Sequence, residues 1–203
     1  MAKIWFLVAA ALPMMCAAQS EAVSLFNGTD MTNWEITPFG TGGMVKVEDG
    51  AIILGMGDGA TGVTYTGEVP MQNYEISLKA RRLDGNDFFC GLTFPVNDRH
   101  LTLVVGGWGG SLVGLSCLDG QDASENETAL IKSFERNRWY GVSVRVLKNV
   151  ITVRIDDETL IEADVSDREL SLRPEVLLSR PLGIAACHTK SAIKEIKLTR
   201  LTE

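Results

Sequence analysis

The chain of 203 residues has little of what marks a metal centre, a disulfide framework or a nucleic-acid binder. It has two histidines and four cysteines, and none of them stands at a spacing typical of zinc ligands. Acidic residues outnumber basic ones by 26 to 19, so the net charge is −7 and there is no cationic surplus to bind a phosphate backbone. We therefore expect no metal, no cofactor and no nucleic-acid partner.

Long apolar runs are also lacking, except near the start of the chain. Residues 1–18 contain an early lysine, a short apolar stretch and small residues before a polar one, which is the pattern of a secretory signal peptide cleaved after Ala18. The stretch is too short to span a membrane. An alternative is a lipid anchor through Cys16. We expect a secreted or periplasmic protein with one domain over residues 19–203 and no transmembrane segment in the mature chain.

Three cysteines remain beyond this leader, namely Cys90, Cys117 and Cys187. Their odd number and wide spacing do not indicate a disulfide framework. One disulfide with one free thiol and three buried thiols are both compatible with the sequence.

Helical periodicity is almost absent, whereas runs with a two-residue period and many β-branched residues are frequent. Over residues 74–81, even-numbered positions are apolar and odd-numbered ones polar or small, so the even set is expected to face between two sheets. Trp34 and Trp139 are expected to be mostly buried. The pattern predicts an antiparallel sandwich, with strands at 24–26, 44–47, 51–54, 62–66, 74–82, 87–94, 101–105, 111–117, 130–134, 139–147, 150–155, 159–165, 182–187 and 192–198.

The opening segment "SLFNGTDMTNWE" is followed in order by "VKVEDGAIIL", "NYEISLKARR", "GLTF" and "LGIAACHTKSAIKEIKLTRL". This series resembles the secreted bacterial 3-keto-disaccharide hydrolase domain family over essentially the whole mature chain. The resemblance implies an all-β fold, a concanavalin A-like jelly-roll sandwich of two curved antiparallel sheets with a carbohydrate site on the concave face. The chain departs from the common pattern at Ala80 and Arg81 and around "NDFFCG" and "CHTKSA", so a complete active site is not transferred from the family.

One tryptophan stands between two pairs of glycines, in "GGWGG" at 106–110. Glycines in a loop let a flat ring lie open to a ligand, and a sugar ring stacks its apolar face on such an indole. Trp108 is therefore a candidate substrate-binding residue. The alternative is that its ring plugs one end of the sandwich.

The remaining candidates lie in two polar turns and at one strand end. "LDGNDFFCG" and "CLDGQDASENET" supply carboxylates and amides suited to sugar hydroxyls or acid–base chemistry, although ordinary turn capping and a solvated acidic loop are the commoner explanations of such segments. His188 follows the last cysteine. The candidates are Asp87, Asp122 and Glu125 for catalysis, and Asn86, Asn126 and His188, with Trp108, for substrate binding.

These residues favour a carbohydrate partner, because carboxylates, amides and an indole together suit a sugar ring. The first hypothesis is a secreted hydrolase of glycosidic bonds, with 3-keto-disaccharides as the substrates that the resemblance implies. The alternatives are a non-catalytic carbohydrate-binding or adhesive module and a structural envelope protein. The fold by itself does not separate them.

Overall fold

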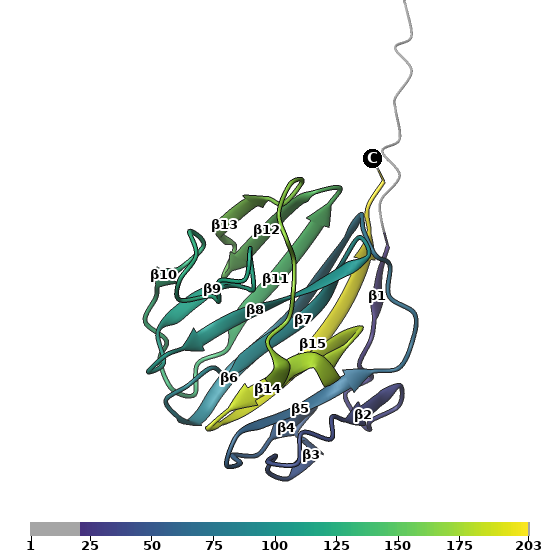
Figure 1. Ribbon diagram of the computed structural model, residues 1–203. Helices are drawn as coiled ribbons and strands as arrows, with labels where there is room; N and C mark the ends of the chain where they lie inside the picture. Colours follow the sequence, from purple (N-terminus) through teal and green to yellow (C-terminus); the bar gives the residue numbers. More distant parts are fainter. Residues whose placement is uncertain (1–20, 203) are drawn as a thin grey trace, which may run out of the picture.

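The computed structural model describes residues 21–202, which form two antiparallel β-sheets packed face to face (Figure 1). The eight-stranded sheet contains β1 (Ala22–Ser24), β3 (Val45–Glu48), β4 (Ala51–Leu54), β6 (Tyr74–Gly85), β11 (Tyr140–Leu147), β12 (Val150–Ile155), β13 (Glu158–Asp164) and β15 (Thr189–Arg200). The seven-stranded sheet contains β2 (Trp34–Ile36), β5 (Ala60–Tyr65), β7 (Cys90–Val96), β8 (Arg99–Gly107), β9 (Leu112–Ser116), β10 (Leu130–Ile131) and β14 (Leu182–Cys187). A short 3₁₀ helix, η1 (Pro174–Ser179), precedes β14.

Neither sheet follows the order of the chain. The eight-stranded sheet runs β13-β12-β11-β6-β15-β4-β3, with β1 paired to β15, and the seven-stranded sheet runs β10-β9-β8-β7-β14-β5-β2. The first and last strands of the described chain lie side by side, because Ser24 lies opposite Lys197 in the β1–β15 ladder. The predicted signal peptide at 1–18, with Cys16, lies outside the described residues.

The alternation of apolar and polar residues along the strands places the core between the sheets. Along β6 and β11 every second side chain is buried, and Ile76, Leu78, Val142 and Val144 pack against the inner face of the other sheet. The strands β4, β12 and β14 have the bounds that the sequence predicts. Two short elements, β2 and η1, were not predicted from the sequence. Segments of three to six residues contain too few repeats of the apolar–polar period for the pattern to be detected.

The two tryptophans that are expected to be mostly buried have different environments. Trp34 is 4% exposed and its indole Nε1 donates a hydrogen bond to the Leu25 carbonyl at 2.8 Å, as predicted. Trp139 is partly buried, but it lies on the outer face of the eight-stranded sheet and not between the sheets. The neighbouring Tyr140 points into the core, so alternation turns Trp139 outward, where Arg81 and Lys194 contact its ring.

Two segments cover much of the outer face of the seven-stranded sheet. The acidic loop, residues 117–129, packs Ala123 against Gly114 of β9. The strap, residues 165–181, includes η1, and its Leu178 carbonyl accepts a hydrogen bond from Thr64 of β5 at 3.2 Å. Figure 1 shows the strap in yellow-green crossing in front of this sheet. The site described below lies on this face, beside the strap.

The three cysteines among the described residues are free thiols: Cys90 and Cys117 are buried and Cys187 is partly buried. Cohesion of the described domain therefore rests on the burial of apolar side chains between the sheets. Within residues 21–202, no helix has the length and apolar character needed to cross a bilayer.

The contrast between the tryptophans gives a stability prediction. Trp34→Ala removes a buried ring and its hydrogen bond, so the free energy of unfolding is expected to fall by about 3–5 kcal/mol. Trp139→Ala, made on the outer face, is the matched control and should cost less than half as much. Urea unfolding of both variants measures this, and equal losses would contradict the assignment.

Candidate functional site

A pocket of about 610 Å³ lies on the outer face of the seven-stranded sheet, between the strap and the loops at the end of the strands. Its floor is formed by residues of β5, β8, β9 and β14 whose side chains point away from the core. We call it the Trp108 pocket. Its lining is Phe39, Thr41, Gly59, Ala60, Asp87, Phe88, Thr102, Val104, Trp108, Ser116, Arg173, Glu175, Val176, Cys187 and His188.

Trp108 lies at the β8–β9 turn with 46% of its surface exposed, so it does not plug the core. Its φ of 45° is in the left-handed region, which a bulky residue rarely adopts. Phe39 and Phe88 add aromatic surface to the same pocket. An open indole beside polar groups is a surface on which the apolar face of a sugar ring packs.

The turn that carries Trp108 is held by the guanidinium of Arg82, which is buried near the end of β6. Its Nη2 donates to the carbonyls of Gly106 at 3.1 Å, Gly110 at 2.9 Å and Asp87 at 3.2 Å. A Cβ at Gly106 would lie 2.5 Å from this nitrogen, and one at Gly110 would lie 3.3 Å from it. The glycines of "GGWGG" thus make room for a buried cation as well as supplying the positive φ.

Asp87 lies in the turn between β6 and β7, within the lining of the pocket. Its backbone N–H donates to the Thr189 hydroxyl at 3.0 Å, and its Oδ1 accepts from the Phe88 N–H at 2.7 Å. Oδ2 accepts no hydrogen bond and the carboxylate forms no ion pair within residues 21–202. One carboxylate oxygen of Asp87 is therefore available to a ligand.

The other carboxylates near the pocket are neutralised by the strap. Arg173 forms ion pairs with Asp122 at 2.7 Å and with Glu175 at 3.1 Å. The hydrogen bond from Arg173 lowers the pKa of Glu175 below its ordinary value. Asp122 is further held by Ser124, whose N–H and hydroxyl both donate to its Oδ1. Two charged groups of opposite sign thus face the pocket from the strap as a pair, Arg173 and Glu175.

The β14–β15 turn brings Cys187 and His188 to the lining. Burial, followed by the nearby carboxylates of Asp87 and Glu175, raises the pKa of Cys187 to about 11. The thiol therefore stays protonated at neutral pH and is a poor nucleophile. His188 is exposed and has a φ of 44°.

The structure brings together three of the residues singled out in the sequence, Asp87, Trp108 and His188. Asp122 joins them only through its ion pair with Arg173. Asn86 and Glu125 are exposed and lie outside the lining of the pocket.

Asn126 is also outside the pocket, because it is buried and organises the acidic loop. Its amide nitrogen donates to the carbonyls of Leu115 at 2.8 Å and Asp122 at 2.7 Å, and its oxygen accepts from Thr128. These hydrogen bonds occupy both ends of the side chain.

Three charged residues that hold or line the site were not predicted from the sequence, namely Arg82, Arg173 and Glu175. Arg82 left a signal, since it occupies an inward position of β6 where the alternation calls for an apolar side chain. Arg173 and Glu175 left none, because the fold alone brings the strap over the sheet. No group of three or more His, Cys, Asp or Glu side chains in the described part of the chain is arranged to hold a metal ion.

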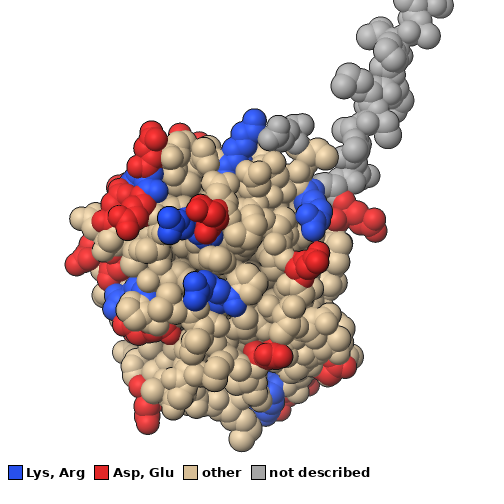
Figure 2. Space-filling view, turned by 45° about the vertical axis from the view of Figure 1, so that its right-hand side comes forward, with Lys and Arg blue, Asp and Glu red and all other residues tan. Residues whose placement is uncertain are grey.

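Basic and acidic side chains are scattered over the face drawn in Figure 2, much of which is uncharged. The basic groups visible there do not merge into one continuous surface. Such a surface suits a neutral ligand better than a polyanion.

Comparisons with known proteins support the fold and the family. The family model described as the 3-keto-alpha-glucoside-1,2-lyase-like domain matches residues 21–199. No curated protein matches the chain in sequence.

Solved structures with the same sandwich have low sequence identity to the chain. The carbohydrate-binding module CBM66 from Bacillus subtilis has a TM-score of 0.57 and 12% identity, covering 84% of this chain and 98% of that one. The Crh5 transglycosylase has a TM-score of 0.59 and 11% identity, covering 92% and 86%. The carbohydrate recognition domain of Emp46p, in its potassium-bound form, has a TM-score of 0.57 and 15% identity, covering 89% and 96%. These likenesses confirm the predicted concanavalin A-like jelly-roll sandwich.

The contacts of Arg82 give a prediction about the turn that carries Trp108. Arg82→Lys removes the planar guanidinium, so the three carbonyls lose their shared donor and the free energy of unfolding should fall by about 1–3 kcal/mol. In fluorotryptophan-labelled protein, the fluorine resonance of Trp108 should broaden or shift. Arg145→Lys, at an exposed position of β11, is the control. An Arg82→Lys protein with unchanged stability and an unchanged Trp108 resonance would show that the turn holds its shape without the cation.

Proposed function

Because the chain belongs to the family of 3-keto-alpha-glucoside-1,2-lyase-like domains, we propose that the Trp108 pocket binds a sugar ring and that Asp87 is the base in cleavage of a glycosidic bond there. The observation that carries this proposal is that an exposed indole and a carboxylate without an ionic partner line one pocket. The indole provides the stacking surface, and the free oxygen of Asp87 provides the acceptor for a proton.

A keto group at C3, two carbons from the glycosidic carbon C1, makes this chemistry accessible to a single base. The ketone at C3 acidifies the hydrogen on C2, and a carboxylate removes it as a proton. The electron pair left on C2 forms a double bond to C1 as the bond from C1 to the bridging oxygen breaks. The departing oxygen then takes up the proton that Asp87 received, so the step needs no further reagent.

The pairing of the other carboxylates favours this elimination over hydrolysis by two carboxylates. The usual hydrolytic mechanism needs one carboxyl group on each side of the scissile bond. Glu125 lies outside the pocket, and Asp122 and Glu175 are paired with Arg173. Asp87 is thus the carboxylate of the original three that both lines the pocket and is free of a cation.

A second function is favoured by the same ion pairs. If Arg173 holds Asp122 and Glu175 permanently, the pocket offers a stacking surface and the one carboxylate of the described lining without an ionic partner, Asp87, which suffices for a non-catalytic carbohydrate-binding module. From the pattern of residues 1–18, which is typical of a signal peptide, we further propose that the protein acts outside the cytoplasm. Cleavage after Ala18 would release it, whereas acylation of Cys16 would anchor it to a membrane.

Trp108→Ala tests the binding surface. Because the ring is half exposed, the melting temperature should change little, while the affinity for a bound sugar should weaken by about 1–3 kcal/mol. Calorimetric titration with 3-ketosucrose measures the affinity. Met44→Ala, at another exposed apolar side chain, is the control. Early unfolding combined with normal binding in the cold would reject the stacking role.

Asp87→Asn tests the chemistry. The amide still accepts the hydrogen bond from the Phe88 N–H but cannot remove a proton, so turnover of 3-ketosucrose should fall by about 100-fold or more with affinity retained. Glu125→Gln, an exposed carboxylate outside the pocket, is the matched control and should leave turnover unchanged. Wild-type protein that binds the keto-sugar without converting it would establish the binding module instead.

A further inference from the structure

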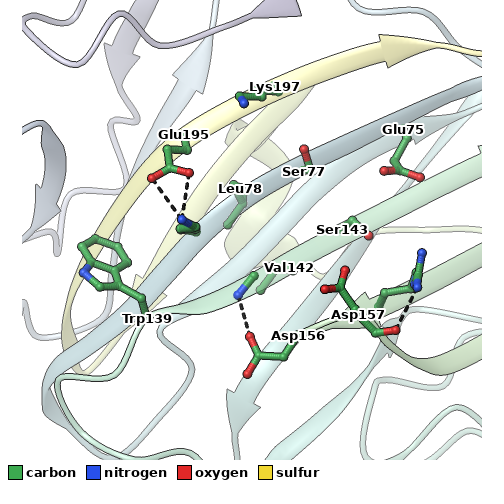
Figure 3. Close-up of a pocket in the computed structure, with 13 residues that line it drawn as sticks. Glu75, Ser77, Leu78, Trp139, Val142, Ser143, Asp156, Asp157, Glu195 and Lys197 are labelled. Atoms are coloured by element: carbon green, nitrogen blue, oxygen red, sulfur yellow. Dashed lines mark hydrogen bonds and ion pairs between the residues drawn. The ribbon is translucent and has the colours of Figure 1, made fainter. Parts of the chain in front are cut away.

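A second hollow, of about 540 Å³, lies on the outer face of the eight-stranded sheet, so the core separates it from the Trp108 pocket. It runs over β15, β6, β11 and the turn after β12, as Figure 3 shows. We call it the Ser77 trough. For this surface the sequence predicted only that the odd-numbered positions of residues 74–81 face away from the core.

Small side chains in adjacent strands form the floor of the trough. Ser77 of β6 lies opposite Ser143 of β11, and Gly141 lies opposite Lys79. The alternation that buries Ile76 and Leu78 turns these serines outward. Because Ser77, Ser143 and Gly141 are small, the charged residues around them stand above the floor as walls.

Irregular backbone raises the walls on both sides. On one side, the β6–β15 register slips between Lys194 and Lys197, and Glu195 has a φ of 53°. Its carboxylate pairs with Lys79 at 3.0 Å. A bulge in a sheet re-aims a side chain in this way.

On the other side, the β12–β13 register slips after Val153, and the turn at Asp156 and Asp157 has φ values of 51° and 66°. Asp156 accepts the Gly141 N–H at 2.9 Å and pairs with Arg138 at 2.8 Å. Figure 3 shows Glu195 and Asp156 on opposite sides, with Trp139 near one end and Glu75 near the other.

Five polar side chains that line the trough have no hydrogen bond or ion pair to any described residue: Glu75, Ser77, Ser143, Asp157 and Lys197. They offer two carboxylate acceptors, two hydroxyls that both donate and accept, and one ammonium donor. The lining as a whole holds four carboxylates and three cations, namely Glu75, Asp156, Asp157 and Glu195 with Lys79, Arg154 and Lys197. A ligand that fits this set is neutral and carries many groups that both donate and accept.

We propose that the Ser77 trough is a second carbohydrate-binding site, which takes a segment of a neutral oligosaccharide chain. Hydroxyls spaced along such a chain meet the alternating donors and acceptors, whereas the near balance of charge disfavours a polyanion. A peptide added as a strand does not fit, since β6, β11, β12 and β15 are each paired on both sides. The proposal does not depend on catalysis in the Trp108 pocket.

Fluorine NMR of the full chain labelled with fluorotryptophan reads the two sites separately. Trp139 borders the trough, Trp108 borders the other pocket, and the buried Trp34 is an internal control. Single Trp→Phe variants assign the resonances. The probes are cellohexaose, laminarihexaose and maltohexaose, each raised to about 10 mM, because single-site sugar affinities are often in the millimolar range.

We expect the Trp139 resonance to move saturably with at least one hexaose, in wild-type protein and equally in Trp108→Ala, while the Trp34 resonance stays fixed. Ser143→Tyr fills the floor and removes several hydrogen bonds between the protein and the sugar. The affinity measured from the Trp139 response should therefore fall about tenfold. Thr152→Tyr adds the same bulk on β12 outside the trough and should leave the response unchanged. Lys197→Ala, at an exposed position, should weaken it severalfold even where Ser143→Tyr fails to fold.

A Trp139 resonance unmoved by all three hexaoses would overturn the proposal. A response lost in Trp108→Ala would also overturn it, since Trp139 would then be reporting the first site. Failure of the function proposed for the Trp108 pocket has a different signature, namely an unmoved Trp108 resonance and no turnover of the keto-sugar.

Discussion

A buried cation joins the two sheets at one end of the sandwich. Arg82 belongs to the eight-stranded sheet, yet its guanidinium binds carbonyls in the turns that begin β7 and end β8, in the other sheet. Its own carbonyl accepts the Asn137 N–H at 2.8 Å, in the segment that leads into β11. A buried charge is tolerated only where it is well bonded, so these turns are constrained to keep their carbonyls on it. The positions of Asp87 and Trp108 follow from that constraint.

The carboxylates of the acidic loop have a structural role in the fold, because they bind the strap. Two arginines of the strap bind it, Arg168 through Asp119 and Glu127, and Arg173 through Asp122. Hydrogen bonds from the Glu169 N–H and from Arg168 lower the pKa of Asp119. The density of carboxylates therefore anchors the strap over the sheet, and the strap in turn forms one wall of the Trp108 pocket.

Periodicity in the sequence was enough to predict the strands with long alternating patterns, such as β6, β11 and β12, because burial on one face imposes the pattern. Short elements such as β2 and η1 could not be read, and the outward turn of Trp139 depended on register relative to Tyr140. For the site, the sequence indicated Asp87, Trp108 and His188, whose turns meet at one end of the sheet. Arg173 could not be found, since its role arises from a contact with Asp122 across about fifty positions of chain.

The strand order has a consequence for the sequence of events during synthesis. The last two strands to be made are inserted into the middle of the sheets: β14 lies between β7 and β5, and β15 lies between β6 and β4. Until these strands leave the ribosome, β5 and β7, like β4 and β6, face one another across a gap with unpaired backbone edges. The nascent chain therefore cannot close either sheet early, and its folding is delayed until nearly the whole domain has been translated.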